Sequence, residues 1–168
     1  MTVFYKGGNN MADITYRELR SDETELLKEF LYEAIFVPEG EIAPSRDIVE
    51  LPELKIYYED FGIGFADYCM VAEDNGRVIG AAWTRIMDDY GHVDEETPSF
   101  AISLYKEYRN QGIGTELMLR TLDLLRQAGF ARASLAVQRA NYAIKLYEKV
   151  GFTTVDWDSE EYIMVCDL

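Results

Sequence analysis

The chain has 168 residues, 48% of them hydrophobic and 13% aromatic, which indicates one globular domain with a sizeable core rather than a disordered segment. Sixteen lysines and arginines stand against 31 acidic residues, so the formal charge is −15. This balance argues against a nucleic-acid partner or an anionic membrane, since both attract basic side chains, and it favours cations such as amines. The acidity is equally explained by solubility alone.

The first residues and the cysteines bear on the setting of the domain. Residues 1–11 are predicted to form a flexible N-terminal extension, because the Lys6–Asn10 run has the composition of a loop, and the domain is expected over residues 12–168. No run approaches the ~18 apolar residues of a membrane span, and no secretion signal is evident, so we expect a cytoplasmic protein. Cys69 and Cys166 are expected to be reduced core residues.

The first half of the chain predicts a strand, a helix, an irregular segment and a hairpin. The prolines within residues 37–66 break that segment into short pieces, and the Asp-Asn-Gly-Arg sequence at 74–77 is typical of a tight turn between strands. The expected elements are a strand Ile14–Leu19, a helix capped by Ser21 and continuing to about Phe36, helical pieces at Arg46–Leu51 and Glu53–Asp60, and strands Tyr68–Glu73 and Val78–Met87.

The second half alternates strands and helices. The expected elements are a strand Ser99–Tyr105, a helix Gly112–Ala128, a strand Arg132–Val137, a helix Asn141–Val150, and strands Phe152–Val155 and Tyr162–Cys166. The strand–helix–strand unit over residues 99–137 implies parallel strands with a right-handed crossover, whereas the hairpins imply antiparallel neighbours. The predicted fold class is therefore α/β (α+β): a single domain with a mixed central β-sheet flanked by helices.

The most distinctive sequence is the turn Tyr108–Thr115 between a strand and the longest helix. Glycine at 112 and 114 removes the Cβ atoms that would keep a ligand away from the backbone. Several backbone N–H groups then converge beside the positive end of the helix dipole, which suits a phosphate. Ordinary strand-to-helix geometry is the alternative explanation of the glycines.

The order Arg109-x-x-Gly112-x-Gly114, helix, strand, Asn141, helix and Tyr147-x-x-x-Gly151 resembles the GNAT superfamily of N-acetyltransferases. The resemblance extends from about Ile14 to Val165. It implies that the turn binds the pyrophosphate of acetyl-coenzyme A, while the preceding strand splays from its parallel neighbour and pairs with the pantetheine arm. The implied cofactor-binding residues are Ile102, Ser103, Leu104, Arg109, Asn110, Gln111, Gly112, Ile113, Gly114, Thr115 and Asn141.

Simpler explanations exist for several of these residues. A surface salt bridge to Glu107 or Glu116 would also account for Arg109. Asn141 is placed to cap a helix, a role compatible with contact to pantetheine. Core packing explains the apolar residues of the strand at 102–104 equally well.

Two residues are predicted to carry the proton transfers. Tyr147 matches the family's tyrosine and is the candidate general acid, because a phenol with a pKa of about 10 stays protonated at neutral pH and can donate to a thiolate with a pKa of about 8.5. A core tyrosine is the alternative. Glu96 is the candidate general base; relatives often place a glutamate directly after the proline that opens this strand, but here Pro98 is followed by Ser99. The only histidine, His92, is expected to be an exposed bystander.

The resemblance implies an enzyme that moves the acetyl group of acetyl-coenzyme A directly to a primary amine in a ternary complex. The acceptor is expected to be a small cationic amine or a peptide N-terminus, and residues 37–66 and 88–97 are expected to shape its pocket. No cluster has metal-ligand spacing, so no metal is expected. The alternatives are a non-catalytic module that binds or senses acyl-coenzyme A, and an interaction domain that uses the fold as a scaffold. Strand edges near the carboxyl terminus could pair between chains, so a homodimer is also considered.

Overall fold

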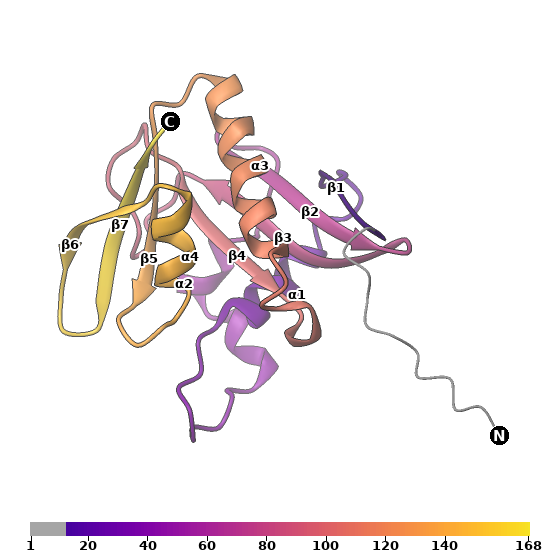
Figure 1. Ribbon diagram of the computed structural model, residues 1–168, viewed down its shortest axis with the longest axis horizontal. Coiled ribbons are helices and arrows are strands. Elements are labelled where there is room, and N and C mark those ends of the chain that lie inside the picture. Colours follow the sequence, from indigo (N-terminus) through magenta and orange to yellow (C-terminus); the bar gives the residue numbers. More distant parts are fainter. Residues whose placement is uncertain (1–12) are drawn as a thin grey trace.

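The computed structural model describes residues 13–168, so the predicted extension at 1–11 lies outside the described residues. Seven strands form one sheet in the order β1-β2-β3-β4-β5-β7-β6 (Figure 1). The strands are β1 Ile14–Glu18, β2 Tyr68–Asp74, β3 Arg77–Arg85, β4 Ser99–Leu104, β5 Arg132–Gln138, β6 Thr153–Trp157 and β7 Glu161–Asp167. Neighbouring strands are antiparallel except β4 and β5, which are parallel. The predicted mixed sheet in a single α/β domain is confirmed.

Helices cover both faces of this sheet (Figure 1). They are α1 Leu26–Ala34, α2 Pro52–Lys55, α3 Ile113–Ala128 and α4 Ile144–Val150, with short 3-10 turns η2 Arg46–Glu50 and η3 Lys106–Tyr108. Apolar residues of α3 and α4 pack on one face of the sheet, and those of α1 pack on the other against Val71 and Trp83. Cys69 and Cys166 are buried and free, as predicted. Among the described helices, none is both long enough and apolar enough to cross a membrane.

The parallel pair β4–β5 separates almost as soon as it forms. The only paired position is Ser99 with Ser134, where the Ser134 N–H donates to the Pro98 carbonyl at 2.9 Å. β5 is paired over its whole length on its other side with β7, and β4 is paired with β3. The two strands therefore open into a V toward their carboxyl ends (Figure 1), as the resemblance implied.

Strand alternation decides which backbone groups face this V. The Tyr105 N–H donates to the Ile79 carbonyl at 3.1 Å, on the β3 side of β4. Because successive residues of a strand point their N–H and C=O groups to opposite sides, those of Ile102 and Leu104 face β5. The backbone of β4 thus presents an unpaired strand edge to the opening.

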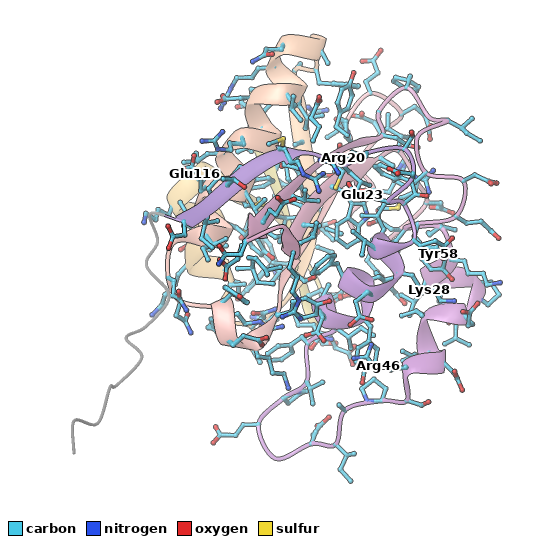
Figure 2. All side chains as sticks on the ribbon, turned by 90° about the vertical axis from the view of Figure 1, so that its right-hand side faces the viewer. Arg20, Glu23, Lys28, Arg46, Tyr58 and Glu116 are labelled. Atoms are coloured by element: carbon cyan, nitrogen blue, oxygen red, sulfur yellow. The ribbon has the colours of Figure 1, made fainter. Side chains whose placement is uncertain are left out.

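The first helix is shorter than the sequence predicts at both ends. Glu23 accepts two hydrogen bonds of 2.7 Å from Arg17 and one of 3.0 Å from the Arg20 N–H, which hold the chain in a turn, and Glu25 rather than Ser21 precedes the helix. Arg20 and Glu23 lie together at this turn (Figure 2). At the other end Ile35 is extended instead of helical. Contacts with distant residues decide both boundaries.

Segment 56–67, which joins α2 to β2, is fixed by one arginine of β3. Arg85 donates to both oxygens of Asp67 at 3.1 Å and to the carbonyls of Ile56 and Glu59 at 2.8 Å. Asp67 also accepts from the Gly62 and Gly64 N–H groups, and its side chain is only 2% exposed. The ion pair therefore anchors an otherwise irregular wall of the molecule.

Removal of this cation tests that role. We expect Arg85→Met to lower the free energy of unfolding by about 3–5 kcal/mol, because it leaves the buried Asp67 carboxylate without its counterion and removes the donor to the Ile56 and Glu59 carbonyls. Urea unfolding measures the change. Arg77→Met, at the exposed start of the same strand, is the matched control and is expected to leave stability nearly unchanged. Equal losses in the two variants would contradict the assignment.

Candidate functional site

A cavity of about 680 Å³, called the first cavity, lies where β4 diverges from β5. Its walls come from β4, the start of α3, the start of α4 and the chain that follows α1. The predicted cofactor-binding and catalytic residues in its lining are Ile102, Ser103, Leu104, Arg109, Asn110, Gly112, Gly114, Thr115, Asn141 and Tyr147. Gln111 and Ile113 are absent from the lining, since the Gln111 side chain donates to the Glu107 carbonyl and Ile113 is buried in the core.

The turn before α3 is shaped by two residues in the left-handed conformation. Asn110 has a φ of 59° and Gly112 a φ of 83°, and α3 begins directly afterwards at Ile113. The first-turn N–H groups of a helix have no partner inside the helix, and here they are directed at the first cavity beside the positive end of a 16-residue dipole. The arrangement is suited to an anion.

The charges in the first cavity differ from those of the whole molecule. Lys106, Arg109 and Lys145 line it, and Glu33 is the one acidic residue in its described lining. In a chain with a formal charge of −15, this excess of cations is local. It reinforces the preference of the α3 N-terminus for a negatively charged ligand.

Arg109 pairs with Glu33 of α1, a partner that the sequence analysis did not predict. Its Nε donates to the Leu104 carbonyl at 3.0 Å, and its Nη2 donates to the Glu33 carbonyl at 3.1 Å and lies 3.5 Å from the Glu33 carboxylate. The expected alternatives do not form, since Glu116 pairs with Arg120 at 2.7 Å. Arg109 therefore joins the end of β4 to the end of α1 and satisfies a last-turn carbonyl of that helix.

Tyr147 combines a core ring with a free hydroxyl. The ring packs edge-on against Phe152 with centroids 6.2 Å apart, so the predicted core role is real. Within residues 13–168 no group hydrogen-bonds the hydroxyl, and the residue lines two cavities. Burial, with a smaller contribution from Tyr142, raises the pKa of Tyr147 to about 12, so the phenol is fully protonated at neutral pH.

Asn141 and Ser103 each make a local bond as well as lining the first cavity. The Asn141 Oδ1 accepts from the Ala143 N–H at 2.9 Å in the turn before α4, but the helix begins only at Ile144 and has no side-chain cap, so the predicted capping role of Asn141 is wrong. The Ser103 hydroxyl donates to the Phe30 carbonyl at 2.6 Å. Ser103 is thus bound to α1, and the free backbone groups of β4 are the N–H and C=O of Ile102 and the N–H of Leu104, since Arg109 occupies the Leu104 carbonyl.

A second cavity of about 250 Å³ lies beside the first, and residues from both faces of the sheet line it. Tyr57, Ala101, Ala136 and Glu161 line it on the face that α1 covers. The two cavities share part of their lining, namely Ala34, Ile35, Phe36, Ile102, Asn141 and Tyr147. They therefore meet through the V between β4 and β5, with Tyr147 at the junction.

The partly buried carboxylate of Asp89 lies behind the wall of the second cavity. Asp89 accepts from the Tyr57 hydroxyl at 2.9 Å and from the Ser99 hydroxyl at 2.8 Å. Burial raises the pKa of Asp89, partly offset by these two hydrogen bonds, and burial together with the Asp89 charge raises the pKa of Tyr57. Ser99, where relatives often carry a glutamate, therefore holds a carboxylate supplied by another segment.

Sequence reasoning did not identify Tyr57, Asp89 or Glu161. Tyr57 and Asp89 fall in the two segments expected to shape an acceptor pocket, which was the available signal. Glu161 lies opposite Gln138 in the β5–β7 register, and only that register places it at the cavity. The predicted general base, Glu96, is exposed and outside both linings, and the partly exposed His92 lies 3.4 Å from the exposed Glu95.

No arrangement of His, Cys, Asp and Glu in residues 13–168 resembles a metal site. The polar groups that converge at the cavities are instead backbone N–H groups, a phenol and an amide. This set can bind an anion, pair with an extended chain and donate a proton.

Comparison with known proteins gives this geometry a family. The model of the Acetyltransferase (GNAT) family matches residues 28–152. A mycothiol acetyltransferase of Streptosporangium roseum is 38% identical over 84 residues, 49% of this chain and 25% of that protein, so the chain spans about a quarter of that relative. N-alpha-acetyltransferase 30 of Schizosaccharomyces pombe is 32% identical over 109 residues, 64% of this chain and 71% of that protein.

A solved structure shows the same fold at lower sequence identity. A putative acetyltransferase from Salmonella typhimurium, determined with acetyl-CoA, aligns with a TM-score of 0.67 over 92% of this chain and 94% of that one, at 20% identity. The family match covers the turn before α3, the diverging strands and Tyr147. The chain belongs to the acetyltransferase (GNAT) family.

Proposed function

We propose that this chain transfers the acetyl group of acetyl-coenzyme A to a primary amine, either a small cationic amine or a peptide N-terminus, by direct transfer in a ternary complex. The observation that carries the proposal is the position of Tyr147, whose unpartnered hydroxyl lies where the two cavities meet. One cavity would hold each substrate, and the reacting atoms would then meet beside a protonated phenol.

The first cavity fits the cofactor. The first-turn N–H groups of α3, with Lys106 and Lys145, would bind the phosphates. The unpaired N–H and C=O groups of Ile102 would pair with the extended pantetheine as a neighbouring strand does, and the Asn141 amide lies along the same wall. Acetyl-coenzyme A supplies the acetyl thioester, and the free donors of β4 can polarise its carbonyl.

Tyr147 is suited to protonate the leaving group. Its pKa of about 12 keeps the phenol protonated, so it can donate a hydrogen bond to sulfur as negative charge develops there. Because a thiol has a pKa of about 8.5, complete transfer of the proton to the thiolate is uphill and requires that the phenolate then regain a proton from solvent. The amine must lose a proton before attack. Glu96 stays a prediction for that role, and it has no contact with either cavity.

The relatives do not agree on an acceptor. One is named for mycothiol and another for N-terminal amino groups, and this chain spans only part of each. A non-catalytic acyl-coenzyme A module would use the first cavity alone. The second cavity, which shares Tyr147 and part of its lining with the first, favours the enzyme.

Alanine substitutions at the two glycines of the turn test the contributions of this turn to folding stability and to cofactor binding. Gly112 needs its left-handed conformation, so we expect Gly112→Ala to cost about 1–2 kcal/mol of unfolding free energy. A Cβ at Gly114 would lie 3.5 Å from Leu146 and 3.7 Å from Leu104, which is ordinary contact, so Gly114→Ala is expected to fold normally. That methyl group would still enter the first cavity and weaken coenzyme A binding about tenfold.

Calorimetric titration with coenzyme A and thermal unfolding measure the two effects. The contrast in stability is the control, since Gly112→Ala is expected to lose both stability and affinity and Gly114→Ala affinity alone. Unchanged affinity in Gly114→Ala would show that the cofactor does not lie against the start of α3.

Loss of the Tyr147 hydroxyl tests the reaction itself. We expect Tyr147→Phe to lower kcat about 100-fold while the Kd for acetyl-coenzyme A stays unchanged, because only proton donation is removed. Tyr142→Phe, at an exposed position of the same wall, is the matched control and should retain full activity. Thiol release with a panel of amines provides the measurement. A wild-type chain that binds the cofactor but releases no thiol would favour the binding module.

We also propose that copies of the chain pair through the edge strand β6. All five of its residues are exposed, among them the apolar Val155 and Trp157. Light scattering tests this, with twice the chain mass expected and the mass of a single chain contradicting it.

A further inference from the structure

We infer that the second cavity takes a primary amine with a single positive charge, carried on a compact apolar group without a carboxylate, and that Glu161 binds the ammonium. The inference rests on the proposed function and specifies its acceptor. It makes Glu161 a specificity-determining residue.

Glu161 is a negative charge with no counterion. It is the one charged side chain in the described lining of the second cavity, and its carboxylate has no hydrogen bond or ion pair with any described residue. Burial raises the pKa of Glu161, and neighbouring carboxylates raise it further; these are Asp158, Glu160 and Asp89. A half-buried carboxylate among like charges is costly until a cation reaches it, so the cavity favours an ammonium group.

The position of Glu161 directs that cation toward the junction. Glu161 lies opposite Gln138, the last residue of β5, and cross-strand partners project to the same face of a sheet. Its side chain therefore enters from the α1 face of the sheet, while Tyr147 lines the cavity from the V. An amine drawn to Glu161 lies in the same cavity as the phenol.

The rest of the cavity selects an apolar body. Its lining is mostly hydrophobic, with Leu31, Ala34, Phe36, Leu54 and Ala136 among the members. Cavities of about 150 Å³ hold benzene, so 250 Å³ has room for one ring and a short aminoalkyl arm.

Tyr57 keeps the wall of this cavity in place. Its hydroxyl donates to Asp89, and its carbonyl accepts from the Trp83 indole at 3.0 Å. Tyr57 is therefore held at its backbone by Trp83 and at its hydroxyl by Asp89, which resists a movement of the ring to make room for a larger ligand. No cation lines the cavity in the described residues, so a carboxylate on the acceptor would meet Glu161 unpaired and be rejected.

A matched pair of acceptors tests the selectivity. 2-Phenylethylamine and phenylalanine differ by one carboxylate, and thiol release from acetyl-coenzyme A reports transfer to either. We expect kcat/KM for 2-phenylethylamine to exceed that for phenylalanine about 100-fold or more, because of like-charge repulsion. Spermidine and a tripeptide with an N-terminal phenylalanine complete the panel, and both are expected to be poorer acceptors.

A matched pair of variants tests the residue. We expect Glu161→Gln to raise the KM for 2-phenylethylamine about tenfold or more, since a charged partner is replaced by a neutral one of the same shape. Its Kd for acetyl-coenzyme A should not change, and its unfolding temperature should not fall, since an unpaired charge is removed. Glu160→Gln removes the adjacent, exposed carboxylate and is expected to change the KM less than twofold.

The outcomes separate this inference from the proposed function. No thiol release from the wild-type chain with any amine of the panel would overturn both. Transfer to the tripeptide, spermidine or phenylalanine as fast as to 2-phenylethylamine would overturn the inference and leave the acetyltransferase proposal standing. Equal effects of the two glutamine variants would also overturn it.

Discussion

β4 and β5 are held together by a single parallel pair, Ser99 with Ser134, and each is otherwise committed to an antiparallel partner on its far side. The backbone groups of Ile102 and the N–H of Leu104, which would complete a ladder, are left facing an opening, while the Leu104 carbonyl accepts from Arg109. A strand edge of this kind costs free energy unless a ligand or water satisfies it. The same divergence leaves room for two cavities that share part of their lining.

The two cavities carry opposite charge. Around the first cavity, the helix dipole, Lys106 and Lys145 create a positive region in an acidic molecule. Glu161 lines the second cavity, and Asp89 lies behind Tyr57. A phosphorylated donor and a cationic acceptor would each be drawn to its own cavity before any chemistry begins.

Local chemistry explains which parts of this arrangement could be predicted from sequence. The turn at Tyr108–Thr115 was recognisable because Gly112 is required there by its own backbone conformation. Tyr147 was recognisable by its spacing from Gly151, and Arg109 by its place in the motif. Contacts between separate elements cannot be recognised from a local motif. The start of α1 depends on the bond from Arg17 of β1 to Glu23, and Arg109 pairs with Glu33 of α1 rather than with a residue near it in sequence.

The residues in and around the second cavity were harder still to predict from the sequence. The loop at 88–97 contains several carboxylates, and the sequence does not indicate which one turns inward. Glu96 is exposed, whereas Asp89 is held by Tyr57 and Ser99, two residues from separate segments. Glu161 depends on strand register, since a shift of one residue would turn it to the opposite face. The absence of a glutamate after Pro98 put the assignment of the general base in doubt, and Ser99 there bonds the Asp89 carboxylate.

Arg109 connects the walls of the two cavities. Its guanidinium bonds the end of β4, beside the first cavity, and the last turn of α1, whose following residues Ile35 and Phe36 line both cavities. Any movement of this side chain toward a bound phosphate would loosen its hold on α1, so the walls around donor and acceptor cannot shift independently. Affinities at the two sites would then be coupled, and by reciprocity each substrate would alter the binding of the other.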